Sequence, residues 1–268
     1  MKTIGFAGAG NMACALGGGI LASPGAAFEV LASDPSEAAR ARFAQETGGR
    51  TIDDLAGLAA AADVLVLAVK PQIMPLVLGD LAPHLRADTI VVSIAAGVTL
   101  ATLAQALGSD TRLVRAMPNT PALVRRGMTV LVRGGGAEAA DLKLVEELLA
   151  GVGRVLSVED ESLLDAVTAV SGSGPGFVFA YGEAMIEAAV AAGLPAAMAT
   201  ILVQETLAGA AELWCSSGEE AATLRQQVTS KGGTTAAGLE ALAAAGFAAS
   251  IRAAVEAATR RSRALSAG

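Results

Sequence analysis

The first half of the chain alternates short apolar runs with longer segments of helical character. The apolar runs, rich in Val, Ile and Leu, span residues 3–7, 29–33, 64–69, 90–94, 112–116 and 128–132. Candidate helices between them include residues 12–22, 36–47, 100–107 and 137–150. Near-continuous apolar runs are typical of parallel strands covered by helices on both faces. The alternation therefore predicts an α/β fold built on a doubly wound parallel sheet.

After residue 158 the pattern changes to alanine-rich helical segments separated by Gly or Pro. These candidate helices span residues 161–170, 176–192, 195–216, 218–228, 235–245 and 247–263. We therefore predict an α/β domain over residues 1–158 and an all-helical domain over residues 159–268. Alanine-rich helices carry little bulky surface to bury, so we expect the helical domain to dimerise.

Charge and hydropathy narrow the possible partners. The net charge of −7 and pI near 4.8 disfavour nucleic acid and anionic membranes, which bind clustered Lys and Arg. The apolar stretches are interrupted by charges such as Asp63, Lys70 and Glu183, so we expect no membrane span of roughly 20 residues. Because Thr3 already begins a strand with no leader before it, we expect a cytoplasmic protein.

The few Cys and His residues limit the chemistry. Cys14 and Cys215 are far apart and have no neighbouring ligands, so we expect neither a disulfide nor a metal site. His84 is the sole histidine and follows Pro83 in a predicted surface loop. Nothing indicates a nucleophilic triad, which would have to use this histidine.

The first strand runs directly into Gly8-Ala9-Gly10-Asn11-Met12-Ala13, a G-x-G-x-x-A turn that opens a helix. Gly8 permits the tight turn, Gly10 lets the backbone approach a pyrophosphate, and Ala13 lets helix and strand pack closely. The first helical turn, with Asn11 and Met12, offers backbone N–H groups to phosphates. The pattern predicts a Rossmann-type dinucleotide site.

The second strand ends at Ser33 and Asp34, roughly 20 residues after the glycine turn. Asp34 could accept hydrogen bonds from the adenosine ribose, which favours NADH because its charge would repel a 2′-phosphate. Alternatively, Asp34 could be the N-cap of a helix that begins at Pro35. Ser33 and Arg40 could still contact a phosphate, so the predicted cofactor is NADP(H) or NAD(H).

Three further strand ends carry candidate cofactor contacts, because ligands bind at the carboxyl edge of such sheets. One holds Val69, Lys70 and Pro71, where Lys70 is either a solvated charge or a group near the cofactor. Another holds Ala95, Ala96 and Gly97, whose small size leaves room for a flat ring. In the third, two prolines fix the loop of Asn119, which could bind the nicotinamide side or cap a turn.

The densest polar motif of the helical half spans residues 228–239. Its Gly232-Gly233-Thr234-Thr235 segment, at a predicted helix start, places backbone N–H groups and hydroxyls in one concavity. Such a concavity suits a small carboxylate. A glycine-rich turn with a threonine cap is the structural alternative.

Over almost its full length the chain resembles the pyrroline-5-carboxylate reductase family. The resemblance rests on blocks at residues 8–13, 68–72, 95–98, 115–121, 165–175 and 228–239, in that order. The last three blocks are specific to this family. The resemblance implies a Rossmann domain, and a helical domain that interlocks with a second subunit near the active site, as a homodimer or a larger ring of dimers. It implies hydride transfer from NAD(P)H to the C=N bond of 1-pyrroline-5-carboxylate, giving L-proline in the last step of proline biosynthesis.

The resemblance also implies roles for individual residues. Ser230, Gly233 and Thr234 would hold the substrate carboxylate, Thr235 would reach the ring nitrogen as the catalytic group, and Glu161 would lie at the substrate pocket. The cofactor contacts would come from residues 8–13, Ser33, residues 69–71 and residues 95–97.

The chain departs from the family pattern at three places. Lys231 stands where the family often has proline, Asp54-Leu55 where some members have an asparagine near the adenosine phosphate, and Gln227 where another asparagine can touch the nucleotide. These departures weaken any preference for NADPH over NADH.

Two other functions remain open on sequence grounds. A β-hydroxyacid dehydrogenase, or another small imino or keto acid reductase, would share the two-domain plan. Such a dehydrogenase usually uses a lysine or histidine to move the proton of the substrate alcohol, and Lys231 is the sole lysine of the helical half. A catalytically idle dinucleotide sensor is the third hypothesis, although it would not need the Gly232–Thr235 anion pocket.

Overall fold

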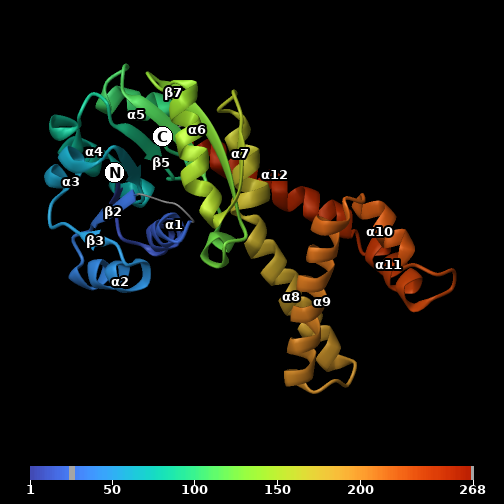
Figure 1. Ribbon diagram of the computed structural model, residues 1–268. Helices are drawn as coiled ribbons and strands as arrows, with labels where there is room; N and C mark the ends of the chain where they lie inside the picture. Colours follow the sequence, from blue (N-terminus) through green and yellow to red (C-terminus); the bar gives the residue numbers. More distant parts are fainter. Residues whose placement is uncertain (24–27, 267–268) are drawn as a thin grey trace. The chain divides into compact units, whose positions relative to one another are not determined.

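The computed structural model describes residues 1–23 and 28–266 (Figure 1). Its described strands form one sheet in the order β3-β2-β1-β4-β5-β6-β7-β8. The strands are β1 (Lys2–Ala7), β2 (Phe28–Ser33), β3 (Arg50–Thr51), β4 (Val64–Leu67), β5 (Ile90–Ser93), β6 (Arg112–Met117), β7 (Gly127–Gly135) and β8 (Gly153–Ser157). The predicted Rossmann-type doubly wound sheet is confirmed, since the order reverses between β1 and β4.

Helices connect these strands and then make up most of the remaining chain. Those of the α/β part are α1 (Asn11–Leu21), α2 (Glu37–Thr47), α3 (Leu55–Ala61), α4 (Met74–Leu81), α5 (Leu100–Leu107) and α6 (Ala139–Leu149). The later ones are α7 (Leu163–Val167), the π-helical turn η5 (Thr168–Gly172), α8 (Gly174–Ala191), α9 (Ala196–Ser217), α10 (Ala221–Gln227), α11 (Thr234–Ala244) and α12 (Phe247–Ser266). Short 3₁₀ turns are η1 (Pro71–Ile73), η2 (Ala82–His84), η3 (Thr120–Val124) and η4 (Ala150–Val152).

Strand β7 departs from the expected parallel arrangement. It pairs antiparallel with β6, with Met117 opposite Val130. The connection between them contains only η3 and a reversal at Arg125, whose φ is 57°. So short a connection cannot make the crossover that a parallel pair requires. The adjoining edge strand β8, which the apolar pattern did not indicate, is parallel to β7.

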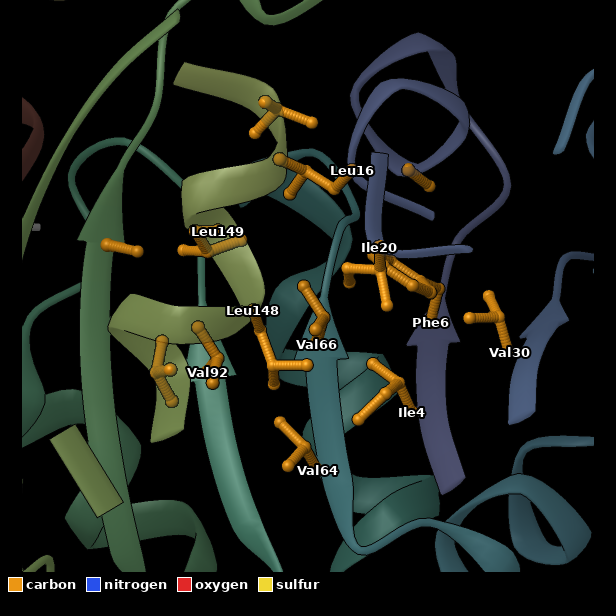
Figure 2. Packing of buried hydrophobic residues seen from close by; sticks show 14 of the residues in the cluster. Ile4, Phe6, Leu16, Ile20, Val30, Val64, Val66, Val92, Leu148 and Leu149 are labelled. Carbon is orange, nitrogen blue, oxygen red and sulfur yellow. The ribbon is translucent and has the colours of Figure 1, made fainter. Parts of the chain in front are cut away.

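Apolar side chains cover both faces of the sheet. On one face Val64 and Val66 of β4 pack with α1 and α6, as Figure 2 shows through Leu16, Ile20 and Leu148. The intervening Leu65 and Leu67 point to the other face, where α3, α4 and α5 cover them. Burial of alternate residues on two faces explains why the strands read as unbroken apolar runs.

The chain divides into two compact units. The first comprises Met1–Ser173 with Ala257–Gly268, and the second comprises Gly174–Glu256. The first unit thus includes β8, α7 and the last turns of α12. This division by compactness differs from the sequence-based boundary after residue 158, and the domain limits given there stay a prediction.

The predicted break between helices near residues 170–176 is wrong. The helix that starts at Leu163 continues to Ala191 through η5, where Ser173 N–H donates to the Thr168 carbonyl at 2.8 Å. The wide π turn accommodates Pro175, which lacks an N–H group, without ending the helix. Contrary to the expectation of no such segment, this helix meets the length and composition of a membrane span, a criterion that core helices of soluble proteins also meet.

The second unit has few buried side chains. Residues Gly182, Ala199 and Val203 are the buried positions of α8 and α9, and α10 and α11 have none. Several large apolar side chains of these helices are exposed, including Val178, Phe179, Ile201, Leu213 and Trp214. A unit of this kind has almost no core in a single chain.

Candidate active site

The carboxyl ends of β1, β2 and β4 meet at the point where the strand order reverses. Gly8 N–H, just after β1, donates to the Ser33 carbonyl at 2.8 Å. On the other side, Ala68 N–H donates to the Ala7 carbonyl at 2.8 Å. The predicted glycine turn therefore lies between the ends of its two neighbouring strands, where doubly wound sheets bind ligands.

The glycine turn has the shape that its sequence predicts. Gly8 has φ of +100°, and a Cβ there would lie 2.7 Å from the Ala68 carbonyl oxygen. Gly10 is the N-cap of α1 and makes no side-chain cap, and the space around its Cβ position is open to 4 Å. Ala13 is fully buried against the sheet. The first N–H groups of α1, at Asn11 and Met12, are thus available to an anion.

Asp34 fixes the glycine turn. Its Oδ2 accepts from Ala9 N–H and its Oδ1 from Ser36 N–H, each at 2.9 Å. The alternative in which Asp34 caps a helix starting at Pro35 is wrong, because Ser36 is the N-cap and α2 begins at Glu37. Each carboxylate oxygen has a further lone pair, so a ribose hydroxyl can still bind.

A cavity of about 470 Å³ adjoins this turn. Four predicted cofactor residues, Gly8, Ser33, Asp34 and Val69, line it. Two others, Pro71 and Gly97, line a second cavity of about 470 Å³ in the same unit. These predicted cofactor residues thus line two separate cavities at the carboxyl edge of the sheet.

The loop of Ala95, Ala96 and Gly97 is held by contacts that sequence reasoning missed. A Cβ on Gly97 would lie 2.9 Å from the Leu265 Cβ, in the last turn of α12. Ser262 of α12 donates to Asp165 at 2.7 Å, which ties this end of the chain to α7. No local signal marks these contacts, because they join residues more than 90 positions apart.

Glu161 supports the same loop from another side. Its Oε1 accepts from Leu100 N–H at 2.8 Å and from the buried Arg115 guanidinium at 2.7 Å. These bonds connect the start of α5 to β6. The place of Glu161 at a substrate pocket stays a prediction, while its observed partners make it a support of the loop that follows β5.

Asn119 and Lys70 occupy different environments. The Asn119 amide donates to the Ser171 carbonyl at 3.1 Å and accepts from Met128 N–H at 2.8 Å, so it links β7 to η5. It makes no side-chain cap on η3. Lys70 is exposed at the end of β4. The nicotinamide contact suggested for Asn119 stays a prediction, and most of its hydrogen-bonding capacity is already used.

The Gly232–Thr235 segment of the second unit forms the predicted helix start. Gly233 is the N-cap of α11, with no side-chain cap. A Cβ on Gly233 would collide with Ser230 Oγ, so the glycine lets this hydroxyl lie close to the N-cap of α11 in its present rotamer. Thr234 and Thr235 begin the helix with exposed side chains. Free N–H groups beside a hydroxyl are what a small carboxylate requires.

Cys14, on α1 behind the glycine turn, is not a nucleophile candidate. Burial is the main cause that raises the pKa of its thiol, and the neighbouring Glu46 raises this pKa further. The thiol therefore stays protonated near neutral pH. Among residues 1–23 and 28–266, no cluster of three His, Cys, Asp or Glu side chains suits a metal ion.

Two family models match the chain. Residues 3–97 match the model described as "NADP oxidoreductase coenzyme F420-dependent", which covers the glycine turn and the strands around it. Residues 161–265 match "Pyrroline-5-carboxylate reductase dimerisation". A doubly wound sheet with an open glycine turn at its switch point, together with the first match, defines a nicotinamide-dinucleotide-dependent oxidoreductase.

Named relatives give the family. The pyrroline-5-carboxylate reductase of Pseudomonas aeruginosa is 44% identical over 97% of this chain and 95% of its own, and that of Escherichia coli is 39% identical over 93% of both. The chain belongs to the pyrroline-5-carboxylate reductase family.

Solved structures agree with this assignment. The Coxiella burnetii pyrroline-5-carboxylate reductase superposes with a TM-score of 0.92 at 35% identity, covering 99% of this chain and 98% of the other. A Plasmodium falciparum pyrroline carboxylate reductase with NADP bound gives 0.88 at 30% identity, with the same coverage. The similarity extends over both compact units.

Proposed function

We propose that the chain reduces 1-pyrroline-5-carboxylate to L-proline with a hydride from NAD(P)H, as the last step of proline biosynthesis. The observation that supports this proposal is the Ser230–Thr235 segment, where a hydroxyl lies beside a helix N-terminus without a side-chain cap, in a family member whose sheet has an open glycine turn. A dinucleotide sensor would need only the second of these features. The pyrroline-5-carboxylate reductases of Pseudomonas aeruginosa and Escherichia coli, to which the chain is similar over 93% or more of its length, support the proposal.

Binding and orientation do most of the catalytic work in this proposal. The substrate carboxylate accepts hydrogen bonds from the first N–H groups of α11 and from Ser230 Oγ, and the helix dipole adds to their attraction. The nicotinamide supplies the hydride when bound. Because a protonated C=N bond is already a strong electrophile, fixing the imine at the correct distance contributes most of the rate gain.

Thr235 is the proposed catalytic residue. Its side chain is exposed at the start of α11, two residues after the Gly233 N-cap. A hydroxyl both donates and accepts, so it can orient the ring nitrogen and exchange its proton with water. The sole histidine, His84, lies in η2 and has no part in this scheme.

The proposed assembly is a homodimer formed through the helical unit, or a larger ring of such dimers, in the cytoplasm. Residues 161–265 match a family model named for dimerisation. A second subunit would bury the exposed apolar side chains of α8 and α9. Hydride transfer requires that a substrate held by the Ser230–Thr235 segment reach a nicotinamide held by a glycine turn.

Absorbance of NADH and NADPH at 340 nm, with 1-pyrroline-5-carboxylate added, tests the activity directly. Thr235→Ala is expected to lower kcat by about 100-fold with a small change in KM, because it removes a proton-transfer group. Thr235→Ser keeps the hydroxyl and should retain most of the activity. Turnover of a 3-hydroxy acid with the oxidised cofactor, and none of the imine, would make the chain a hydroxyacid dehydrogenase instead.

A further inference from the structure

The cavity beside Gly8 has the composition expected at the adenosine end of a dinucleotide. It begins at the glycine turn, where the pyrophosphate would lie, and extends past Ser33 and Asp34 at the end of β2. Its far side is formed by Val77 of α4, by Leu55 at the start of α3 and by Asp53 just before that helix. The role of this cavity as a cofactor site rests on the proposed function.

All the charged side chains that line this cavity, among the residues that the structure describes, are acidic. They are Asp34, Asp53 and Asp80. Asp34 is held in place by the backbone of the glycine turn and of Ser36, so it cannot swing away from a ligand. A 2′-phosphate placed next to the ribose would therefore enter a region of negative charge.

Arg40 is a cation that contacts two of these acidic residues, Asp34 and Asp53. Its Nη1 donates to the Asp34 carbonyl at 2.6 Å, and its Nη2 lies 3.6 Å from Asp53 Oδ1. Its side chain is only 20% exposed. The hydrogen bond to the Asp34 carbonyl holds the guanidinium on the protein, while the ion pair with Asp53, whose side chain is 93% exposed, offsets only a small part of its positive charge.

The apolar lining adds to this effect. Leu55 occupies the first position of α3, and its apolar side chain lines the cavity. The neighbouring Asp54 carboxylate accepts from Gly57 N–H at 2.6 Å, as the N-cap of the same helix. Neither side chain can donate a hydrogen bond to a phosphate.

We infer that this site selects NADH over NADPH. Asp34 is the main specificity-determining residue, because its fixed carboxylate accepts hydrogen bonds from ribose hydroxyls and repels a phosphate in the same place. Asp53 and Asp80 add a weaker, more exposed repulsion.

Titration of the unliganded protein with each nucleotide, followed by the fluorescence of the reduced nicotinamide, tests the inference without turnover. NADH is expected to bind at least about tenfold more tightly than NADPH at low ionic strength. Added salt should bring the two dissociation constants closer together, because it screens the repulsion of the 2′-phosphate. The double variant Asp53→Asn/Asp80→Asn should tighten NADPH binding several-fold and NADH binding less, because only NADPH carries the 2′-phosphate. The double variant Asp110→Asn/Glu147→Gln removes two exposed carboxylates that do not line this cavity, so it is the matched control for net charge and should change neither.

Arg40→Ala provides the opposing test. If the guanidinium acts as a structural bond to the Asp34 carbonyl, its loss should weaken both nucleotides alike. Selective loss of NADPH binding would make Arg40 a phosphate ligand and would overturn the inference, as would NADPH binding as tightly as NADH in the unchanged protein. Failure of both nucleotides to bind would overturn the proposed function as well, so the two failures are distinguishable.

Discussion

The two compact units of this chain bury their large apolar side chains to very different extents. In the first, helices cover both faces of the sheet and large side chains such as Phe6, Phe43 and Leu67 are fully buried. In the second, Phe179 and Trp214 are 68% and 55% exposed. The difference indicates that the first unit is stable within one chain, while the second needs another copy to bury its apolar surface.

The two candidate binding segments differ in the same way. Strand pairing and Asp34 fix the glycine turn inside the first unit, so it is preformed in a single chain. The Ser230–Thr235 segment is largely exposed in its own unit. We therefore expect nucleotide binding to depend little on assembly and catalysis to depend on it strongly.

The largest expected effect tests the need for a second copy. Phe179→Asp with Trp214→Asp should weaken subunit association by at least about 100-fold, because two charges would be buried at the interface. Sedimentation should show monomers, and thermal unfolding should split into an early helical transition and a later one for the α/β unit.

Val124→Asp, at an exposed apolar side chain of the first unit, is the matched control and should leave the assembly intact. A double variant that still sediments as the unchanged oligomer would contradict the comparison between the units. So would a single, unshifted thermal transition.

An intermediate effect separates the two glycines of the turn. Gly8→Ala forces a side chain into the Ala68 carbonyl at a φ of +100° and should cost about 2–4 kcal/mol of stability as well as nucleotide affinity. Gly10→Ala meets open space, so it should leave the melting temperature nearly unchanged and weaken nucleotide binding by about tenfold or more. Calorimetry with a nucleotide titration would measure both. Equal loss of stability in the two variants would show that Gly10 has a structural role.

The smallest expected effect concerns Asp63, which stabilises only the first unit. The Thr3 N–H, which donates at 2.8 Å, is the main cause that lowers the pKa of this carboxyl, and Arg86 lowers it further. Asp63→Asn should cost about 1 kcal/mol at neutral pH, a value reduced by its partial exposure.

The pH dependence of this effect has a defined sign. Because the folded-state pKa lies below the usual value of 3.8, the contribution of Asp63 is complete above that pH and is lost as the pH falls through the folded-state pKa. Denaturant unfolding at several pH values should thus show that the free energies of unfolding of the variant and of the unchanged protein become equal in acid. If the difference in unfolding free energy between the two proteins stays constant down to pH 2, the charge of Asp63 is not the cause of that difference.

Much of the fold could be predicted because its signals are local. The alternating apolar runs located most of the strands, and the glycine turn located the start of α1 to within one residue. Two features were mispredicted for physical reasons. The antiparallel β7 depends on a short connection whose geometry the apolar pattern does not encode, and the helix across residues 163–191 depends on a π turn that absorbs Pro175.

The sequence by itself determined the parallel part of the sheet, the helical second half, the glycine turn and the family, because each depends on residues close together in the chain or on their order. Only the tertiary structure decided that Asp34 bonds to Ala9, that Glu161 holds Leu100 and Arg115, and that Leu265 packs on Gly97. Those contacts join segments distant in sequence, and folding brings such segments together through burial of the whole core rather than through any local pattern.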